Sequence, residues 1–486
     1  MVAADRAARI YDVGETPPPG RVAIVALQHV VVMVASMVAA SRILGLNPGV
    51  TLLCSGAGTL LFHLVTKGKI PLFLGSSFGL TGALAAAAAS YGANGAFVWV
   101  VSVGFAYVIV AAVIAADRRG TLRVLRGRRK ALHLARFRGE SMGWLKRVFP
   151  ASVTGPLVIV VALTLAPAAV REMERGWIAA FASVAVVVGA RIFGRRRELF
   201  VMAPILLGMA GGYLAALGSG GVDFRAVGEA PWLIGFRVIS PSGHLPSFGW
   251  AAVVSLVPMA IAAIVADVGT LYAASGVLDR NLARRPGLHR MLLGNGLATM
   301  LSGLSGGLPQ SAYPEDIGVL ALIGVWSARA IEWAAGMAMV LSVSGKLAAL
   351  VATIPQSVMG GVTVVLSGLV AWSGVRMMVR SDVDLWHMRE LLVASTILAL
   401  GVGGLWLKVK GVVLAGVGPA AVVGIVLNLV LSRPKASEAE EERKKAASRG
   451  VREAAWTLAR AMERERVKAA ERGFLEVAEV AVCEGE

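Results

Sequence analysis

Two short segments interrupt an otherwise apolar chain: Pro71-Leu-Phe-Leu-Gly-Ser-Ser-Phe-Gly79 and Gly307-Leu-Pro-Gln-Ser-Ala-Tyr-Pro-Glu-Asp-Ile-Gly318. Glycine, proline and serine at membrane depth leave backbone groups without helical partners, which is tolerated only where protein or a water-filled cavity surrounds them. Each segment is therefore either a helix break that lines a binding cavity or an ordinary kink packed by its neighbours. The matching positions of the two segments in the two halves of the chain favour the cavity.

The composition around these segments is that of a membrane protein. Of the 486 residues, 56% are hydrophobic and 16% are charged, and the mean hydropathy is +0.71. A soluble chain carries about 25% charged residues, and the sequence lacks the short alternating segments of a transmembrane β-barrel. Apolar runs of about 20 residues recur, so we predict an all-α polytopic membrane protein with about 14 spans. The expected spans cover residues 22–41, 43–64, 70–90, 94–116, 151–170, 177–194, 199–218, 247–273, 291–308, 310–325, 330–345, 347–371, 390–407 and 411–432.

Basic residues concentrate in the loops that follow even-numbered spans. Loops rich in lysine and arginine face the cytoplasm, which places both termini there. This bias accounts for the net charge of +18 without any binding of nucleic acid. The basic residues are Arg118, Arg119, Arg123, Arg126, Arg128, Arg129, Lys130, Arg136, Arg138, Lys146 and Arg147 in the first loop, Arg191, Arg195, Arg196 and Arg197 in the second, and Arg280, Arg284, Arg285 and Arg290 in the third.

A linker rich in glycine, serine and proline divides the chain into two halves of about seven spans each. Because seven is odd, the second half enters the membrane in the opposite sense, which is the inverted repeat of many transporters. The charged tail mixes lysine and arginine with glutamate at helical spacing, which indicates a solvated helix. The expected order is an N-terminal cytoplasmic tail 1–21, spans one to four 22–116, a basic cytoplasmic loop 117–150, spans five to seven 151–218, the external linker 219–246, spans eight to eleven 247–345, spans twelve to fourteen 346–432, and the cytoplasmic tail 433–486.

Very few ionisable residues lie within the spans, so each is a candidate functional residue. Asp267 lies in span eight, and Glu315 and Asp316 lie in the interrupted span ten. A carboxylate at the membrane centre is costly and requires a cavity or a partner. His29 follows Gln28 in span one, where a lone histidine is more often a hydrogen-bonded packing residue than a proton relay.

The sequence offers neither a metal site nor a catalytic constellation. The six histidines are scattered, and neither an HExxH motif nor a paired-cysteine spacing occurs. Cys54 and Cys483 provide no disulfide framework. We therefore expect no cofactor, no metal ion and no enzymatic activity.

Several short motifs occur in the order found in one family of transporters. With these motifs, from Gln28-His29 to about Leu431, the chain resembles the nucleobase–ascorbate, or nucleobase:cation symporter-2, transporters and most closely the uracil permeases. The motifs are Leu60-Leu-Phe-His-Leu-Val-Thr-Lys-Gly-Lys69, Gly75-Ser-Ser-Phe78, Thr154-Gly-Pro156, Pro286-Gly-Leu-His-Arg290, Gly294-Asn-Gly-Leu297, Glu315-Asp-Ile-Gly-Val319 and Pro355-Gln-Ser-Val-Met-Gly-Gly361.

The resemblance implies a fold and a mode of action. Segments one to four and eight to eleven would form a core domain, and segments five to seven and twelve to fourteen a gate domain. Segments three and ten would each contain a short strand followed by a half-helix, with the substrate between the helix N-termini. Relatives are homodimers of the plasma membrane that move the core against the gate, with a proton accompanying the base. Sodium remains open as the coupling ion.

The site residues follow from the family motifs, with departures. In segment ten the family reads Gln, Glu or Pro followed by Asn-x-Gly; here Glu315 and Gly318 match, and Asp316 replaces the asparagine. A uracil-type site has Tyr-Gly before the glutamate; Tyr313 matches, and Pro314 removes a backbone donor.

Segment eight departs further. The family's substrate-binding glutamate, three residues before Gly269, is Ala266 here, and the uracil-type histidine is Thr270. The resemblance implies the following substrate contacts and further motif residues: Glu315, Tyr313, Ser77, Phe78, Ala266 and Thr270, with Gln28, His29, Asp316 and Gly318.

Asp267 lies one residue beyond the family's glutamate position, and one residue turns a helical side chain by about 100°. We expect Asp267 to carry the coupling proton, alone or shared with Glu315, rather than to bind the base. The structural alternative is a hydrogen-bonded aspartate that pins neighbouring backbone.

The sequence is compatible with three functions. The first is proton-coupled uptake of a nucleobase, uracil or a xanthine-like base, by alternating access. The second is transport of an anion on the same fold, which the acidic residues Glu315 and Asp316 disfavour. The third is a transport-inactive membrane scaffold or sensor that acts through the charged tail. Ala266 and Pro314, which depart from the family's motifs, are the kind of change expected in a transporter that has lost its activity.

Overall fold

The computed structural model describes residues 11–43, 46–118, 148–193, 198–233, 250–381, 383, 387–404, 406–409, 412–415 and 417–431. Residues 1–430 form one compact unit and residues 431–486 a second. The expected helix in the tail 433–486 and most of the basic loop 117–150 lie outside the described residues.

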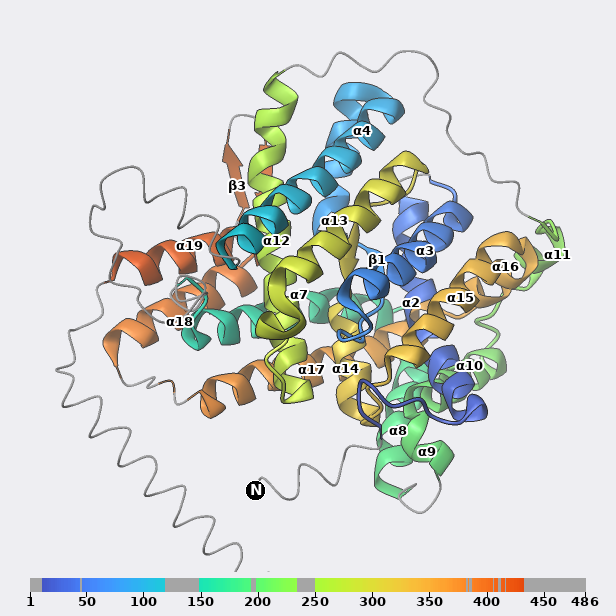
Figure 1. Cartoon of the computed structure of the whole chain (residues 1–486). Helices are drawn as coiled ribbons and strands as arrows, with labels where there is room; N and C mark the ends of the chain where they lie inside the picture. Colours follow the sequence, from blue (N-terminus) through green and yellow to red (C-terminus); the bar gives the residue numbers. More distant parts are fainter. Residues whose placement is uncertain are drawn as a thin grey trace, which may run out of the picture. The chain divides into compact units, whose positions relative to one another are not determined.

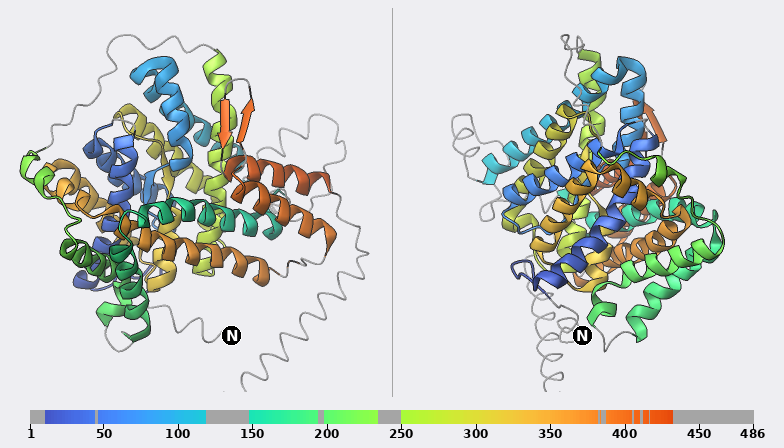
Figure 2. Two further views of the ribbon diagram at one scale, coloured as in Figure 1. Left: turned by 180° about the vertical axis from the view of Figure 1, so that it is seen from behind. Right: turned by 90° about the vertical axis from the view of Figure 1, so that its right-hand side faces the viewer.

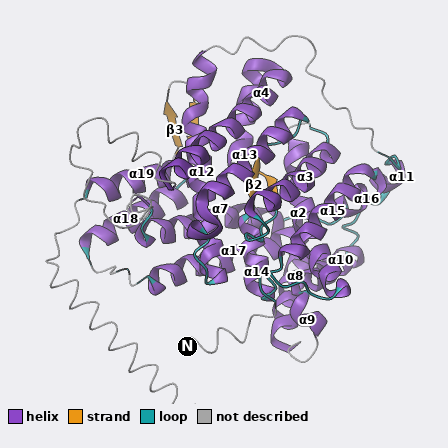
Figure 3. Cartoon of the chain, viewed as in Figure 1, coloured by secondary structure: helices purple, strands orange, loops and turns teal. Residues whose placement is uncertain are grey.

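The first unit is a bundle of helices with two pairs of short strands (Figures 1 and 3). In the first half of the chain the elements are α2 (Pro19–Ile43), α3 (Pro48–Thr66), β1 (Leu74–Ser76), α4 (Phe78–Arg118), α7 (Ala151–Met173), α8 (Trp177–Phe193), α9 (Glu198–Met202), α10 (Pro204–Gly218) and α11 (Arg225–Glu229). In the second half they are α12 (Trp250–Leu278), the short π-helical turn η2 (Ala283–Gly287), α13 (Leu288–Leu304), β2 (Gln310–Ala312), α14 (Pro314–Ile323), α15 (Ala328–Val343), α16 (Gly345–Ala352), α17 (Gln356–Arg380), α18 (Met388–Val402), β3 (Trp406–Val409), β4 (Val412–Ala415) and α19 (Val417–Val430).

Most expected spans coincide with helices, and the breaks between them have local causes. Gly92 has a φ of 71° and divides α4 near residues 90–94, where the third and fourth expected spans meet. That left-handed conformation favours glycine. The seventh expected span, 199–218, is divided between α9 and α10 at Ala203, before a proline that opens α10.

The single span expected over 347–371 is wrong. The chain forms α16 and then α17, and α16 is bent by 109° from α15. The Ser344 hydroxyl accepts a hydrogen bond from the Leu347 backbone N–H and so starts α16 as a new helix. Pro355 then separates α16 from α17, because the residue before a proline is disfavoured in a helix.

The ends of the last two expected spans, 390–407 and 411–432, are also wrong. The antiparallel pair β3–β4 occupies residues 406–409 and 412–415. As a result α18 ends at Val402 and α19 begins at Val417.

Within the described residues, four helical stretches are long and apolar enough to cross a membrane, and the bent pair α15–α16 would add a fifth. The four are Pro48–Thr66, Gly95–Ala116, Ala151–Met173 and Gln356–Val379. Five shorter apolar helices accompany them. The larger number of about 14 spans stays a prediction.

The most extensive helix contacts fall into two groups. In one, α3 packs on α13 and α15, and α4 packs on α13. In the other, α7 packs on α17 and α18, and α8 packs on α10. This second group also contains α19, which packs on α18, as the view from behind in Figure 2 shows. The groups meet where α14 packs on α17 and where α12 packs on α7, α17 and α19.

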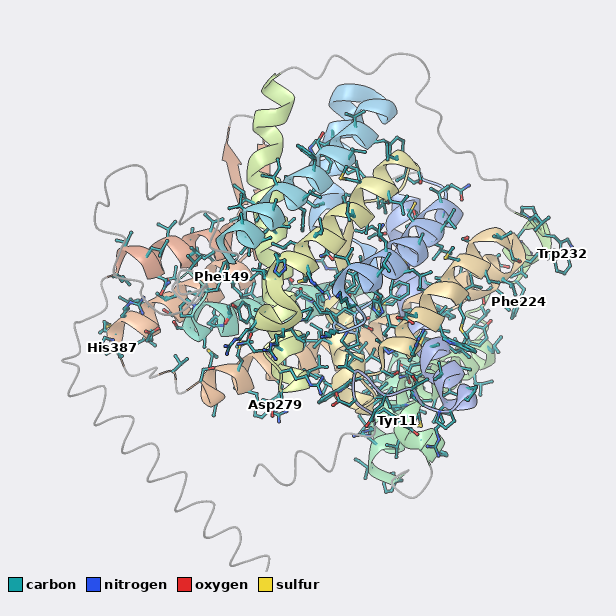
Figure 4. All side chains as sticks on the ribbon, in the orientation of Figure 1. Tyr11, Phe149, Phe224, Trp232, Asp279 and His387 are labelled. Atoms are coloured by element: carbon teal, nitrogen blue, oxygen red, sulfur yellow. The ribbon has the colours of Figure 1, made fainter. Side chains whose placement is uncertain are left out.

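The described part of the linker, residues 219–233, contacts Lys346, the second residue of α16. Its Nζ donates hydrogen bonds to the backbone oxygens of Val227 (3.3 Å) and Gly228 (3.2 Å) and lies 5.2 Å from the ring centroid of Trp232. Figure 4 labels Trp232 beside α11. A cation over an indole ring is a favourable contact, so this lysine fastens the linker to the corner between α15 and α16.

Candidate functional site

The two interrupted segments meet as a pair of strands. β1 and β2 are antiparallel, with Gly75 opposite Ser311 and Ser76 opposite Gln310. A helix begins directly after each strand, α4 at Phe78 and α14 at Pro314. The strand that the resemblance implies in each segment is therefore present, and the pairing joins parts of the chain more than 200 residues apart.

The outer edge of each strand is satisfied by a threonine from a neighbouring helix. The Thr59 hydroxyl of α3 accepts from Leu74 N (2.9 Å) and donates to Leu74 O (3.4 Å). In the same way the Thr299 hydroxyl of α13 accepts from Gln310 N (3.1 Å) and donates to Gln310 O (3.1 Å). Backbone groups freed from helices thus find partners without water, as a buried site in a membrane requires.

Glu315 lies in the first turn of α14 and is 6% exposed. The helix begins at Tyr313, whose side chain makes no capping bond, and at Pro314, which has no N–H to satisfy. The positive end of the helix favours a carboxylate in this position. Among the described residues, Oε2 of Glu315 has no hydrogen-bond partner, so this open oxygen is available to a ligand.

Asp316, the next residue, is fully buried and has a polar neighbour close to each oxygen. Oδ2 accepts a hydrogen bond from Phe73 N (3.0 Å), just before β1. Oδ1 lies 2.6 Å from Nδ1 of His29 on α2, at the distance of an ion pair though not at the angle of a hydrogen bond. Asp316 and His29 therefore tie α14 to α2 and to the start of β1.

Asp267 lies in the middle of α12, 1% exposed, and accepts three hydrogen bonds. Oδ2 accepts from the Tyr107 hydroxyl (2.7 Å) and from Asn295 Nδ2 (2.8 Å), and Oδ1 accepts from the Ser311 hydroxyl (2.5 Å). Its partners come from α4, α13 and β2. The carboxylate thus joins four elements through neutral donors.

The remaining expected substrate contacts surround the strand pair or lie on α12. A Cβ on Gly75 would come within 2.5 Å of the Tyr313 ring, so the absence of a side chain at Gly75 lets that ring lie close to β1. Ser77 N donates to Pro309 O (2.8 Å). On α12, the buried Thr270 donates its hydroxyl to Ala266 O (3.2 Å). Phe78 is the first residue of α4, and its side chain lies outside the described part of the structure.

Two of the expected motif residues mark the boundary between helices. Gly318 allows α14 to approach α17, since a Cβ there would lie 3.0 Å from Leu366 O. Gln28 is fully buried on α2, and its Oε1 accepts from Ile205 N (3.1 Å) and Leu206 N (3.2 Å) at the start of α10.

The sequence did not single out Tyr107, Ser311 or Asn295 as partners of Asp267. Two signals in the sequence contain these partners without assigning them that role: the motif Gly294-Asn-Gly-Leu297 contains Asn295, and the segment Gly307–Gly318 contains Ser311. The part of the chain that the structure describes holds no group of three or more histidine, cysteine, aspartate or glutamate residues arranged for a metal ion.

Comparison with known proteins gives consistent matches. A family model described as "Permease family" (Xan_ur_permease) matches residues 20–124 and 135–409. The uracil permease of Bacillus caldolyticus is 35% identical over 441 residues, covering 88% of this chain and 96% of that protein. The uracil permease of Bacillus subtilis is 33% identical over 444 residues, with the same coverage. Among solved structures, the transmembrane domain of the cyanobacterial bicarbonate transporter BicA is similar, with a TM-score of 0.46 and 15% identity over 85% of this chain and 96% of that chain.

Proposed function

This chain belongs to the permease family, also known as the nucleobase:cation symporter-2 transporters, and on that premise we propose that it takes up a nucleobase, uracil or a xanthine-like base, together with a proton. As a member of that family it is a multi-pass membrane transporter and not an enzyme. The proposed location is the plasma membrane, with both termini in the cytoplasm.

The open oxygen of Glu315 carries this proposal. A nucleobase presents ring N–H groups beside C=O groups on a planar edge, and a carboxylate accepts strong, charge-assisted hydrogen bonds from such N–H groups. A buried carboxylate oxygen without a partner is costly to maintain, so a ligand that donates to it has a large effect on binding. The helix N-terminus around it supports the negative charge while the base is absent.

The strand pair forms the proposed opposite wall of the site. Gly75 brings the β1 backbone close to the Tyr313 ring, and we expect Ser77 and Phe78, where α4 begins, to contribute to this wall. Ala266 and Thr270 on α12 would complete the wall on the side of Asp267. The small Ala266 in place of the family's glutamate leaves Glu315 as the main acidic ligand in this proposal.

Asp267 is proposed to hold the coupling proton, alone or shared with Glu315. Its three partners are neutral donors, so the carboxylate has no counter-charge among them, and protonation would remove the cost of a buried charge. A sodium ion in place of the proton remains an outcome of the transport test.

The two groups of packed helices support a core and a gate that move against each other. Residues 22–116 and 247–345 would form the core, and residues 151–218 and 346–432 the gate. The inverted repeat, with seven spans in each half, is supported by the equivalent roles of Thr59 and Thr299 on β1 and β2. Alternating access would move the strand pair and its half-helices past the gate, in a homodimer.

The two acids beside the strand pair argue against an anion as cargo. Glu315 and Asp316 would repel an anionic substrate from the helix N-terminus that would otherwise attract it. A transport-inactive scaffold is the other outcome to be tested.

Uptake into proteoliposomes tests the proposed function. Purified protein is reconstituted, and entry of labelled uracil and xanthine is followed with an imposed proton gradient, with a sodium gradient, and with neither. Accumulation of one base above equilibrium with the proton gradient, and not in protein-free vesicles, is expected. Accumulation driven only by the sodium gradient would mean that sodium, and not a proton, is the coupling ion. No entry of either base under any gradient would favour the scaffold.

A further inference from the structure

The backbone that leads into β1 is held by side chains of neighbouring helices. Asp316 of α14 accepts a hydrogen bond from Phe73 N. One residue earlier, the buried carbonyl of Leu72 accepts a hydrogen bond from Nε2 of His63, over 3.2 Å. His63 is 3% exposed and lies near the end of α3. It is therefore one of the residues that fix where β1 begins.

Both ring nitrogens of His63 face hydrogen-bond acceptors. Nε2 faces the carbonyl oxygen of Leu72, and Nδ1 lies 3.5 Å from Oε1 of Glu332 on α15. Neither a carbonyl oxygen nor a carboxylate oxygen can donate, so each contact requires a hydrogen on the ring nitrogen. Only the protonated ring carries a hydrogen on both nitrogens. The geometry is therefore that of a positively charged histidine.

Glu332 is the one acidic residue in α3 and in the elements in extensive contact with it, α2, α13, α15 and β1. Its Oε2 accepts a hydrogen bond from Arg329 (3.0 Å), and its side chain is 25% exposed. The other ionisable residues with described side chains on these elements and on the turn after α3 are cations or histidines: Arg21, His29, Lys67, Lys69, His289, Arg290 and Arg329. Cationic neighbours favour the neutral form of His63, whereas a carboxylate favours the charged form. The charge of His63 therefore depends on Glu332.

Loss of the proton leaves one N–H on the ring for two acceptors. A hydrogen bond to a carboxylate is charge-assisted and stronger than one to a carbonyl oxygen, so the remaining hydrogen is expected on Nδ1, toward Glu332. The carbonyl of Leu72 then loses its hydrogen bond at a buried position, which is costly. Because a histidine changes its charge between about pH 5 and 8, the contact that holds the start of β1 weakens as the pH rises through this range.

We propose that His63 and Glu332 form a pH-sensitive pair that positions β1 for substrate binding. With the proton on His63, Leu72 is held and the wall of the site at Gly75 is in place. Without that proton the wall loosens and the base binds less tightly. His63 acts through β1 and is a positioning residue. The inference rests on the proposed function, in which β1 forms one wall of the site.

Equilibrium binding of labelled uracil or xanthine to the purified full-length protein, at about pH 5 and about pH 8, tests this pair with Glu332→Gln. Glutamine keeps the size of the side chain, and its amide can donate to Nδ1 of a neutral ring, so Nε2 keeps its hydrogen for Leu72 at both pH values. Each affinity is divided by that of the wild type at the same pH, so that the titration of groups common to both proteins cancels. Glu229→Gln, at an exposed glutamate of α11, is the matched control.

At about pH 5, Glu332→Gln is expected to bind the base within about twofold of the wild type. At about pH 8 it is expected to bind about tenfold more tightly than the wild type, because it keeps a buried hydrogen bond that the wild type has lost. Glu229→Gln is expected to equal the wild type at both pH values, and His63→Leu, which has no ring N–H, to bind weakly at both. The same ratio of Glu332→Gln to wild type at the two pH values would show a structural role only and overturns the inference.

Thermal unfolding without any base separates this inference from the proposed function. The apparent melting temperature of Glu332→Gln is expected to be close to that of the wild type at about pH 5 and above it at about pH 8. If the wild type binds no base at either pH, the proposed function is wrong, and the melting temperatures still test the pair. A difference between the two proteins that does not change with pH overturns it.

Discussion

Two buried carboxylates lie near the strand pair, and their surroundings differ. Asp267, in the middle of α12, receives three hydrogen bonds from three different elements. Glu315, at the start of the half-helix α14, keeps one oxygen without a partner among the described residues. Both are almost wholly inaccessible to solvent. Burial is therefore the same for the proposed substrate-binding acid and the proposed proton-coupling acid, and the number of hydrogen bonds is what differs between them.

Asp316 is intermediate between these two acids, because one of its oxygens accepts a hydrogen bond and the other does not. It is adjacent to Glu315 and fully buried, yet both of its oxygens have close neighbours, Phe73 N and His29 Nδ1. Its contacts join α14 to the residue before β1 and to α2, and we expect Asp316 to position Glu315. Among these three acids, Glu315 has an oxygen with neither a hydrogen bond nor an ion-pair neighbour in the described residues, and we propose that the substrate binds there.

The largest expected effect is that of Glu315→Ala. The change removes the proposed acceptor of the base's N–H groups, and we expect affinity to fall by about 100-fold or more, since charge-assisted hydrogen bonds in a dry site are the strong ones. Glu315→Gln keeps one acceptor oxygen and is expected to bind weakly. Size-exclusion chromatography and thermal unfolding should show a folded protein in both cases. Wild-type affinity in Glu315→Ala would mean that Glu315 does not bind the base, and the proposed difference in role between Glu315 and Asp267 would be wrong.

Asp267→Asn is expected to separate coupling from binding. The side chain keeps its shape but no longer exchanges a proton, so exchange of labelled base across the vesicle membrane should survive while gradient-driven accumulation and its pH dependence vanish. Counterflow and gradient-driven uptake in the same vesicles measure the two activities. Accumulation that remains proton-driven in this variant would leave Asp267 only its structural role.

The helix breaks and the buried carboxylates could be predicted from the sequence because each depends on the residues of one short segment. Glycine, proline and serine within residues 71–79 and 307–318 predicted the breaks, and the strands lie within them. The sequence predicts one span over 347–371 although Pro355 marks a break before α17, because the composition on either side of the proline is apolar. The carboxylates themselves were evident from their rarity in the spans.

The partners of those carboxylates were not accessible from the sequence. Tyr107, Ser311 and Asn295 lie 160, 44 and 28 residues from Asp267, on separate elements. Periodicity describes one helix face at a time and carries no information on which faces meet. For the same reason the contact of Gln28 with α10, across 177 residues, has no signal in the chain.

A smaller effect is expected at Gly75, on the wall opposite Glu315. Gly75→Val forces the Tyr313 ring away from β1, because even a Cβ would come within 2.5 Å of it. We expect uptake to fall by about tenfold, since small displacements at a binding site cost about one to two orders of magnitude. Gly336→Val on α15, where a Cβ meets nothing within 4 Å, is the control. Equal uptake in the two variants would mean that β1 contributes to helix packing and not to substrate binding.

The smallest effect on binding is expected for Tyr107→Phe, which removes one of the three donors to Asp267. Loss of a hydrogen bond to a buried group costs about 1–3 kcal/mol of stability, so the apparent melting temperature should fall. Affinity for the base should stay within about twofold of the wild type. A loss of affinity well beyond twofold, with little change in the melting temperature, would place Asp267 in the substrate site.

Equilibrium binding of labelled uracil and xanthine in detergent, without any gradient, tests the contrast between the two acids most directly. The wild type, Glu315→Ala and Asp267→Asn are compared at one pH and one protein concentration. Wild type and Asp267→Asn are expected to bind the same base with affinities within about fivefold of each other, and Glu315→Ala is expected not to bind it. Binding that survives in Glu315→Ala and is lost in Asp267→Asn would contradict this expectation.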